Sequence, residues 1–192
     1  WNNGVVNDTI TGLKAGTYTV TVADSAGITV SGNVVIAEPT PISITIDSVS
    51  ILCRVGNNGS LQAIVSGGIP GYFYAWTGGT TANPKTGLTS GMYVVTVTDA
   101  NNCTTSVSAN LSQPDSLIAT ITSTVPTSCF GASDGQATVQ ATGGTPNYTY
   151  AWSTGSSISS SATDLPAGNW TVTVTDANNC TTTTNLTVTE PA

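Results

Sequence analysis

Several residue types are absent or scarce in this 192-residue chain, and each absence narrows the functions that it can have. The chain has no histidine, so a serine or threonine nucleophile would lack its usual base and a zinc site its commonest ligand. Only three side chains are basic, Lys14, Arg54 and Lys85, and they do not cluster as phosphate binding requires. Neither a phosphate-binding glycine loop nor a cofactor motif is present. We therefore expect no catalysis, no cofactor and no nucleic-acid partner.

Charged residues are also scarce: they make up 7% of the chain, which has a net charge of −7 and a pI of about 4.1. The chain is nevertheless not expected to be disordered, since 39% of its residues are hydrophobic and they alternate with threonine, serine and asparagine. This composition predicts a folded all-β chain. Neither a signal peptide nor a membrane span is visible in the sequence, which leaves the parent protein's targeting open.

One phrase occurs three times, at residues 16–27, 91–103 and 168–180, and indicates a repeat protein. In the second copy, GMYVVTVTDANNC, apolar residues recur at steps of two from Tyr93 to Val97 and are followed by Asp99. This alternation predicts a strand with one apolar and one Thr-rich face. The Ala-Asn-Asn that follows favours a turn, and a second alternating run comes after it, so each phrase predicts a β-hairpin.

The period of the repeat is about 75 residues, because Trp1, Trp76 and Trp152 lie 75 and 76 residues apart. We divide the chain into a partial repeat at residues 1–39, the C-terminal half of a sandwich, and complete repeats at 40–114 and 115–192. About seven short strands in each complete repeat are typical of an immunoglobulin- or fibronectin-like β-sandwich. Proline-containing linkers at residues 38–41 and 113–116 should make successive sandwiches stack as a rod. We interpret the chain as a piece of a longer tandem array.

The landmarks of each complete repeat have a fixed order: a cysteine, a Gly-Gly-x-Pro-x-Tyr-x-Tyr-x-Trp run, a strand ending in Asp-x-x-x-Cys, and a closing Gln-Pro or Glu-Pro. This order resembles the SprB repeat over essentially the whole chain. Repeat 2 departs from it at Gly71 and at residues 55–56, where Gly131 stands in repeat 3, and repeat 1 has Ile28 in place of the second cysteine. The residues that carry the resemblance in repeat 3 are Cys129, Gly143, Gly144, Pro146, Tyr148, Tyr150, Trp152, Leu165, Gly168, Trp170, Asp176 and Cys180.

The resemblance implies a very large secreted adhesin of the cell surface. In the gliding-motility members of the family, a motor carries a long filament along the cell surface and the filament grips the substratum. We therefore expect a structural stalk segment that contacts neighbouring repeats head to tail, while other parts of the parent bind surface or polysaccharide ligands. Two alternatives stay open: carbohydrate-binding accessory repeats of a secreted enzyme, and a biofilm or surface-layer building block that self-associates laterally through its sheet edges.

The four cysteines, Cys53, Cys103, Cys129 and Cys180, lie 50 and 51 residues apart within repeats 2 and 3. Their spacing does not suit zinc, and in a secreted chain we expect disulfides. One interpretation joins Cys53 to Cys103 and Cys129 to Cys180. Immunoglobulin-type connections, however, put Cys53 and Cys103 at opposite poles of one domain, whereas bonded cysteines need Cα atoms within about 7 Å. We favour an inter-repeat bond between Cys53 and Cys180, with Cys103 and Cys129 pairing outside this chain.

Aromatic residues alternate along residues 72–76 and again along 148–152. Such a stripe suits a sugar-stacking platform, but it more often belongs to a core strand, which is the interpretation that we favour. The core residues that we predict are Trp76, Trp152, Tyr93 and Trp170.

Oxygen-bearing side chains gather in the turn of each hairpin and in the loop that contains Asp134. Weak candidates for calcium ligands are Asp99, Asn101, Asp176 and Asn178. Because good calcium sites combine several carboxylates, we favour turn capping as their role. An Asp-Ser/Thr-hydrophobic sequence resembles the O-glycosylation acceptor of the bacteria in which the SprB family occurs. The candidate acceptors for this modification are Thr9, Ser25, Ser48 and Ser116.

Overall fold

The computed structural model describes residues 1–153, 155 and 157–192, and all the regular elements in these residues are β-strands. The strands are β1 (Gly16–Ala23), β2 (Thr29–Ile36), β3 (Ser43–Val49), β4 (Gly59–Ser66), β5 (Phe73–Trp76), β6 (Lys85–Leu88), β7 (Gly91–Thr98), β8 (Thr104–Leu111), β9 (Ile118–Val125), β10 (Gly135–Thr142), β11 (Thr149–Trp152), β12 (Ser161–Leu165), β13 (Gly168–Thr175) and β14 (Thr181–Val188). No helix in the described part of the chain is long and apolar enough to cross a membrane.

Each complete repeat is a sandwich of two three-stranded antiparallel sheets. The sheets of repeat 2 have the orders β3-β4-β6 and β5-β7-β8, and repeat 3 has the corresponding orders β9-β10-β12 and β11-β13-β14. This is the immunoglobulin division of strands A, B and E against C, F and G, without strand D. The expectation of about seven strands was therefore too high. Repeat 2, which is described throughout, has six, because residues 77–84 form a turn and loop.

The alternation read from the sequence determines which side chains enter the core. Val95 and Val97 of β7 are fully buried, while Thr96 and Thr98 between and after them face outward. Each repeat has its own buried cluster, one built from residues 51–111 and the other from residues 137–188. Each sandwich therefore has a core of its own, and the limits at residues 40 and 115 remain predictions.

The predicted core aromatics divide into two groups. Trp76 and Trp152 are 3% and 4% exposed, at the centre of their clusters. Tyr93 and Trp170 are only half-buried and pack against the edge of the core. The Tyr93 hydroxyl donates to the carbonyl of Thr89 at 2.9 Å, the arrangement of a tyrosine corner at the start of strand F. Tyr93 and Trp170 therefore pack at the edge of the core, because the hydroxyl of tyrosine and the indole N–H of tryptophan need a hydrogen-bond partner.

The aromatic stripe of each repeat packs inward. Tyr72 and Tyr74 are half-buried against the core of repeat 2, and their counterparts do the same in repeat 3. The Tyr72 hydroxyl donates to the carbonyl of Gly67 at 2.6 Å, and the Tyr148 hydroxyl to that of Gly143 at 2.7 Å. These rings are therefore occupied by packing rather than presented as a flat platform.

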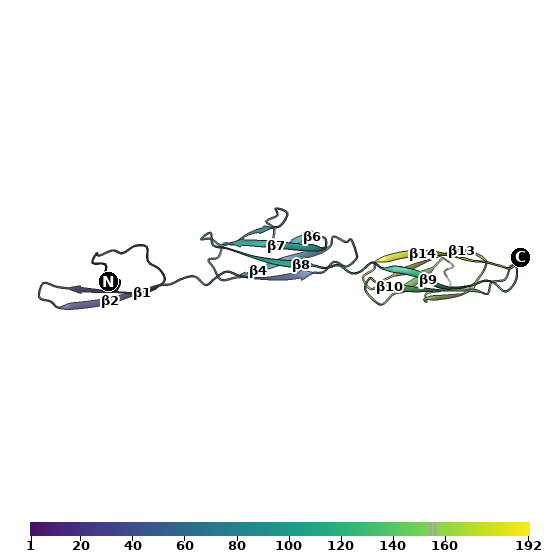
Figure 1. Cartoon of the computed structure of the whole chain (residues 1–192), viewed down its shortest axis with the longest axis horizontal. Helices are drawn as coiled ribbons and strands as arrows, with labels where there is room; N and C mark the ends of the chain where they lie inside the picture. The colour runs from purple at the N-terminus through teal and green to yellow at the C-terminus, as the bar shows by residue number, and fades with distance from the viewer. Residues whose placement is uncertain (154, 156) are drawn as a thin grey trace.

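Repeat 1 consists of the β1–β2 hairpin and the segment before it. Val22 and Val30, which the alternation assigns to an apolar face, are 58% and 71% exposed because no second sheet among the described residues covers them. The hairpin and the two sandwiches follow one another along the long axis of the molecule, with the C-terminus at one end (Figure 1). The chain is thus an elongated array, as the short linkers predict.

Candidate functional site

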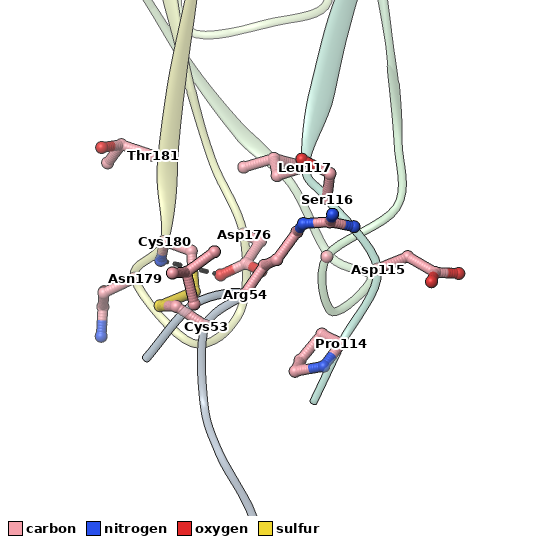
Figure 2. Close-up of a pocket in the computed structure, with 12 residues that line it drawn as sticks. Cys53, Arg54, Pro114, Asp115, Ser116, Leu117, Asp176, Asn179, Cys180 and Thr181 are labelled. Atoms are coloured by element: carbon pink, nitrogen blue, oxygen red, sulfur yellow. Dashed lines mark hydrogen bonds between the residues drawn. A yellow bond between two sulfur atoms is a disulfide. The ribbon is translucent and has the colours of Figure 1, made fainter. Parts of the chain in front are cut away.

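The junction between repeats 2 and 3 brings together two loops that are far apart in sequence. The loop after β3, residues 50–58, meets the turn between β13 and β14, and Cys53 forms a disulfide with Cys180 (Figure 2). The two Cα atoms are 5.7 Å apart, within the ordinary range for a disulfide, although 127 residues separate them in sequence. This is the inter-repeat pair that the sequence favoured.

The alternative pairing within each sandwich is not formed in the structure. Cys103 precedes β8 and the Cys53 loop lies at the other end of that strand, beside Gln113. An eight-residue strand spans about 27 Å, far beyond the reach of a disulfide. Cys103 and Cys129 are both exposed and unpaired within the described chain.

A hydrogen bond accompanies the disulfide across the junction. The amide nitrogen Nδ2 of Asn178 donates to the carbonyl of Leu52 at 3.0 Å and also to the Thr145 hydroxyl at 2.8 Å. The side-chain amide of Asn178 therefore connects the loop of repeat 2 that contains Leu52 to its own turn and to Thr145 in repeat 3.

Asp176 shapes the turn that carries Asn178 and Cys180. One carboxylate oxygen accepts the backbone N–H groups of Asn178 and Cys180, each at 2.9 Å, and the other accepts the N–H of Thr145 at 2.9 Å. Burial alone would raise the pKa of Asp176, but the three N–H donors together outweigh it and lower the pKa below the ordinary 3.8. The turn is thus held by a buried carboxylate, 4% exposed, that stays ionised.

Asp99 performs the same task in repeat 2. Its carboxylate accepts the N–H groups of Ile69, Asn101 and Cys103 at 3.0, 2.9 and 2.8 Å. The N–H of Ile69 contributes most to lowering the pKa of Asp99, followed by those of Cys103 and Asn101 among the lowering causes. The two turns are therefore built alike, which gives Cys103 the same setting as Cys180.

The calcium candidates lie in these two turns. Backbone N–H groups donate to both carboxylates, and Asn178 turns its amide nitrogen to Leu52. Within the described ranges, no three residues of the types His, Cys, Asp and Glu come together as a metal site would need. Asp134 likewise accepts the N–H of Ser128 at 2.9 Å, and bonds from Ser128 lower its pKa.

The closing Gln-Pro or Glu-Pro of each repeat has a role that the sequence reading missed. The side chain of Gln113 accepts the N–H of Val55 at 2.9 Å, and that of Glu190 accepts the N–H of Gly131 at 2.9 Å. Each bond anchors the cysteine-bearing loop to the end of the last strand. The sequence does contain a signal for this contact, because the two bonded residues lie 58 positions apart in repeat 2 and 59 apart in repeat 3.

A second missed feature is the fit between the linker and the paired glycines. A Cβ atom on Gly143 would lie 2.0 Å from the carbonyl oxygen of Ser116, and one on Gly67 would lie 2.0 Å from that of Pro41. Both glycines have positive φ. The linker of each repeat therefore rests directly on a backbone that only glycine can provide.

The junction encloses a cleft of about 470 Å³ beside the disulfide. Arg54 extends across it in the direction of Ser116, with Pro114 at one side and the disulfide at the other (Figure 2). Ser116, one of the candidate glycosylation acceptors, is half-buried here, whereas Thr9, Ser25 and Ser48 are exposed. The junction holds the two sandwiches in one orientation. The chemical bond that does so is the disulfide between Cys53 and Cys180.

Comparison with known proteins finds one family model and several solved structures that are similar to parts of the chain. Residues 45–81 and 121–157 each match the family model of the SprB repeat. No curated protein is detectably similar to the chain in sequence. Among solved structures, the eight N-terminal Ig domains of Down Syndrome Cell Adhesion Molecule isoform 1.30.30 are similar at 12% identity and a TM-score of 0.45, covering 93% of this chain and 28% of that chain.

Two further solved structures are similar at the same level. Sidekick-1 immunoglobulin domains 1–4 share 15% identity at a TM-score of 0.40, over 95% of this chain and 60% of that chain. The C-terminal 282-residue fragment of intimin was solved in complex with the intimin-binding domain of the translocated intimin receptor. It shares 19% sequence identity at a TM-score of 0.39, over 77% of this chain and 64% of that chain. The chain spans less than two thirds of each of these structures.

Proposed function

This chain carries two tandem SprB repeats, and we propose that they are a force-transmitting stalk segment of a long extracellular adhesin on the cell surface. The observation that carries the proposal is the disulfide between Cys53 and Cys180, which joins successive repeats rather than closing a single one. An oxidised cysteine pair is typical of proteins outside the cytosol, which supports the extracellular location.

The junction has two covalent connections, and they support a stiff rod. The backbone crosses once through the linker at Pro114, and the disulfide crosses again at the other side of the cleft (Figure 2). A single connection allows bending about one point, whereas two separated connections oppose bending and twisting together. A rod of this kind transmits a pull along its axis.

The remaining two cysteines extend the same scheme to neighbouring repeats. Cys129 lies in the loop that corresponds to that of Cys53, with Ala132 donating to its carbonyl at 3.1 Å, as Gly56 does to Cys53 at 2.9 Å. Cys103 lies in the turn that corresponds to that of Cys180. We propose that each binds the complementary cysteine of a further repeat, so that disulfides cross each junction at which both cysteines are present, which excludes the hairpin turn of repeat 1 with its Ile28. The more specific proposal, from the family resemblance, is a filament of gliding motility.

The test is peptide mapping, without reduction, of the parent protein taken from the cell surface. We expect a crosslinked peptide pair that contains Cys53 and Cys180, and we expect Cys103 and Cys129 to be linked to peptides from outside residues 1–192. Alkylation before lysis controls for disulfide exchange during preparation. Links between Cys53 and Cys103 and between Cys129 and Cys180 would contradict the proposal, as would free thiols at all four positions.

A further inference from the structure

Lys85 is a buried cation that the sandwich does not need. It begins β6 at the edge of a sheet, is 9% exposed, and is one of three basic residues in a chain of net charge −7. Its Nζ donates to the carbonyl of Thr77 at 2.6 Å and lies 5.7 Å from the centre of the Tyr93 ring. In the part of the chain that the structure describes, this is the ammonium's one hydrogen bond, so two of its three N–H donors remain available.

Repeat 3 shows that the position does not require a lysine. Lys85 pairs with Leu61 across the sheet, and the corresponding pair in repeat 3 is Ala162 with Ala137. Ala162 is 1% exposed, so an apolar residue fills this place in an equally buried setting. Burying a charge with unsatisfied donors costs free energy, and the Thr77 carbonyl satisfies one of the three N–H donors of Lys85. The remaining donors indicate a ligand, because an apolar side chain is sufficient for packing at the matching place in repeat 3.

A pocket of about 560 Å³ opens onto Lys85. Its other polar walls come from Thr77, Thr80 and Thr86, and Tyr93 supplies an aromatic wall. The volume lies in the range of small-molecule sites. Lys85 is the single charged residue of the lining, and no carboxylate lines it.

The loop that forms the mouth of the pocket is fixed in place. The side chain of Asn83 accepts the N–H of Ala63 at 2.9 Å and donates to its carbonyl at 2.8 Å, as a neighbouring strand would. The loop differs from that of repeat 3, where the Trp152 indole N–H donates to the carbonyl of Ser159 at 2.9 Å. In repeat 2 the corresponding Trp76 indole nitrogen is buried without a partner among the described residues. Repeat 2 thus has a local structure of its own around this pocket.

We propose that the pocket binds a saccharide that bears one carboxylate, a hexuronic acid residue of an acidic polysaccharide. The ammonium would receive the carboxylate through charge-assisted hydrogen bonds. The Thr80 and Thr86 hydroxyls suit the neutral hydroxyl groups of a sugar ring, whereas the Thr77 hydroxyl is bonded to the backbone of Val94. The Tyr93 ring suits the apolar C–H face of the sugar. A lining with one positive charge among neutral polar and apolar groups matches a ligand with one negative charge on a neutral sugar ring. This inference is independent of the stalk proposal.

The experiment is an NMR titration of the whole oxidised chain with methyl galacturonide. We expect saturable shifts of the backbone amides of Thr77, Thr86 and Tyr93, with no shifts around Ala162, which serves as the internal control. Methyl galactoside, which lacks the carboxylate, and acetate, which lacks the ring, should each bind at least about tenfold more weakly, as loss of a charged hydrogen bond or of the ring contacts predicts.

The variant Lys85→Met keeps the aliphatic stem and removes the charge, and we expect binding to weaken about 10- to 100-fold. An unchanged spectrum of repeat 2 away from the pocket and an unchanged melting midpoint would show that it folds. If it does not fold, the exposed Thr86→Val variant is measured instead and should weaken binding several-fold. The inference is overturned if the galacturonide gives no saturable shifts, if galactoside or acetate binds equally well, or if the folded Lys85→Met protein binds as the wild type does.

Discussion

Pulling the chain from its two ends should reveal the disulfide as a limit on extension. A force applied at the termini passes through Cys53 and Cys180, so the 127-residue separation between them cannot open while the bond is intact. An extended chain spans about 3.3–3.6 Å per residue, so reduction should release about 420–460 Å of additional length. This gain would come from both sandwiches, because the enclosed segment contains most of the strands of each.

The assay is single-molecule force spectroscopy on the chain held between terminal handles, with and without reductant. The Cys103→Ser/Cys129→Ser variant is the matched control, because it removes the two unpaired thiols and should keep the same limit on extension. The Cys53→Ser/Cys180→Ser variant should extend fully without reductant.

A different pattern would refute the reasoning. If the bonds lay within each sandwich, reduction would release two separate steps of about 165–185 Å, since those cysteines are 50 and 51 residues apart. If the oxidised wild type extended fully, the crosslink would not carry the load at all.

The other predictions concern the turn and linker that position the junction. Gly143→Ala should destabilise repeat 3 by about 2–4 kcal/mol, because its Cβ would meet the Ser116 carbonyl at 2.0 Å and its φ is +71°. Gly131→Ala is the control, with φ +73° and no atom within 4 Å of the added Cβ, and should cost only about 1 kcal/mol in calorimetry; equal costs would disprove the steric argument. Acid should destabilise both repeats, because the lowered pKa values of Asp99 and Asp176 give stability that is present above pH 3.8 and is lost as pH falls through their folded values. A melting-midpoint series from pH 7 to pH 2 tests this, and the Asp99→Asn/Asp176→Asn variant should start lower and fall less; a wild-type midpoint that is flat below pH 3.8 would contradict it.

Much of the fold follows from the sequence because its signals are local. Alternation at steps of two assigns Val95 and Val97 to the core without knowledge of any partner strand, and the Asp-Ala-Asn-Asn turns fix the hairpins. Alternation does not say how many strands a repeat contains, and the expected number of about seven exceeds the six that repeat 2 has, where residues 77–84 form a turn and loop. It also placed Tyr93 in the core, because the pattern cannot show that a hydroxyl reaches outward to Thr89.

The sequence also indicated the region of the junction, since immunoglobulin connections put Cys53 and Cys103 at opposite poles. Which residues contact one another at the junction was decided only by the tertiary structure. The contact of Asn178 with Leu52 joins residues 126 positions apart, and the bond from Val55 to Gln113 closes a loop of 58. Lys85 likewise has no motif, and its pocket exists because β6 begins beside a loop that Asn83 fixes to Ala63. Periodicity along one strand determines which face of it is apolar, whereas the orientation of two domains depends on contacts between residues that no local pattern relates.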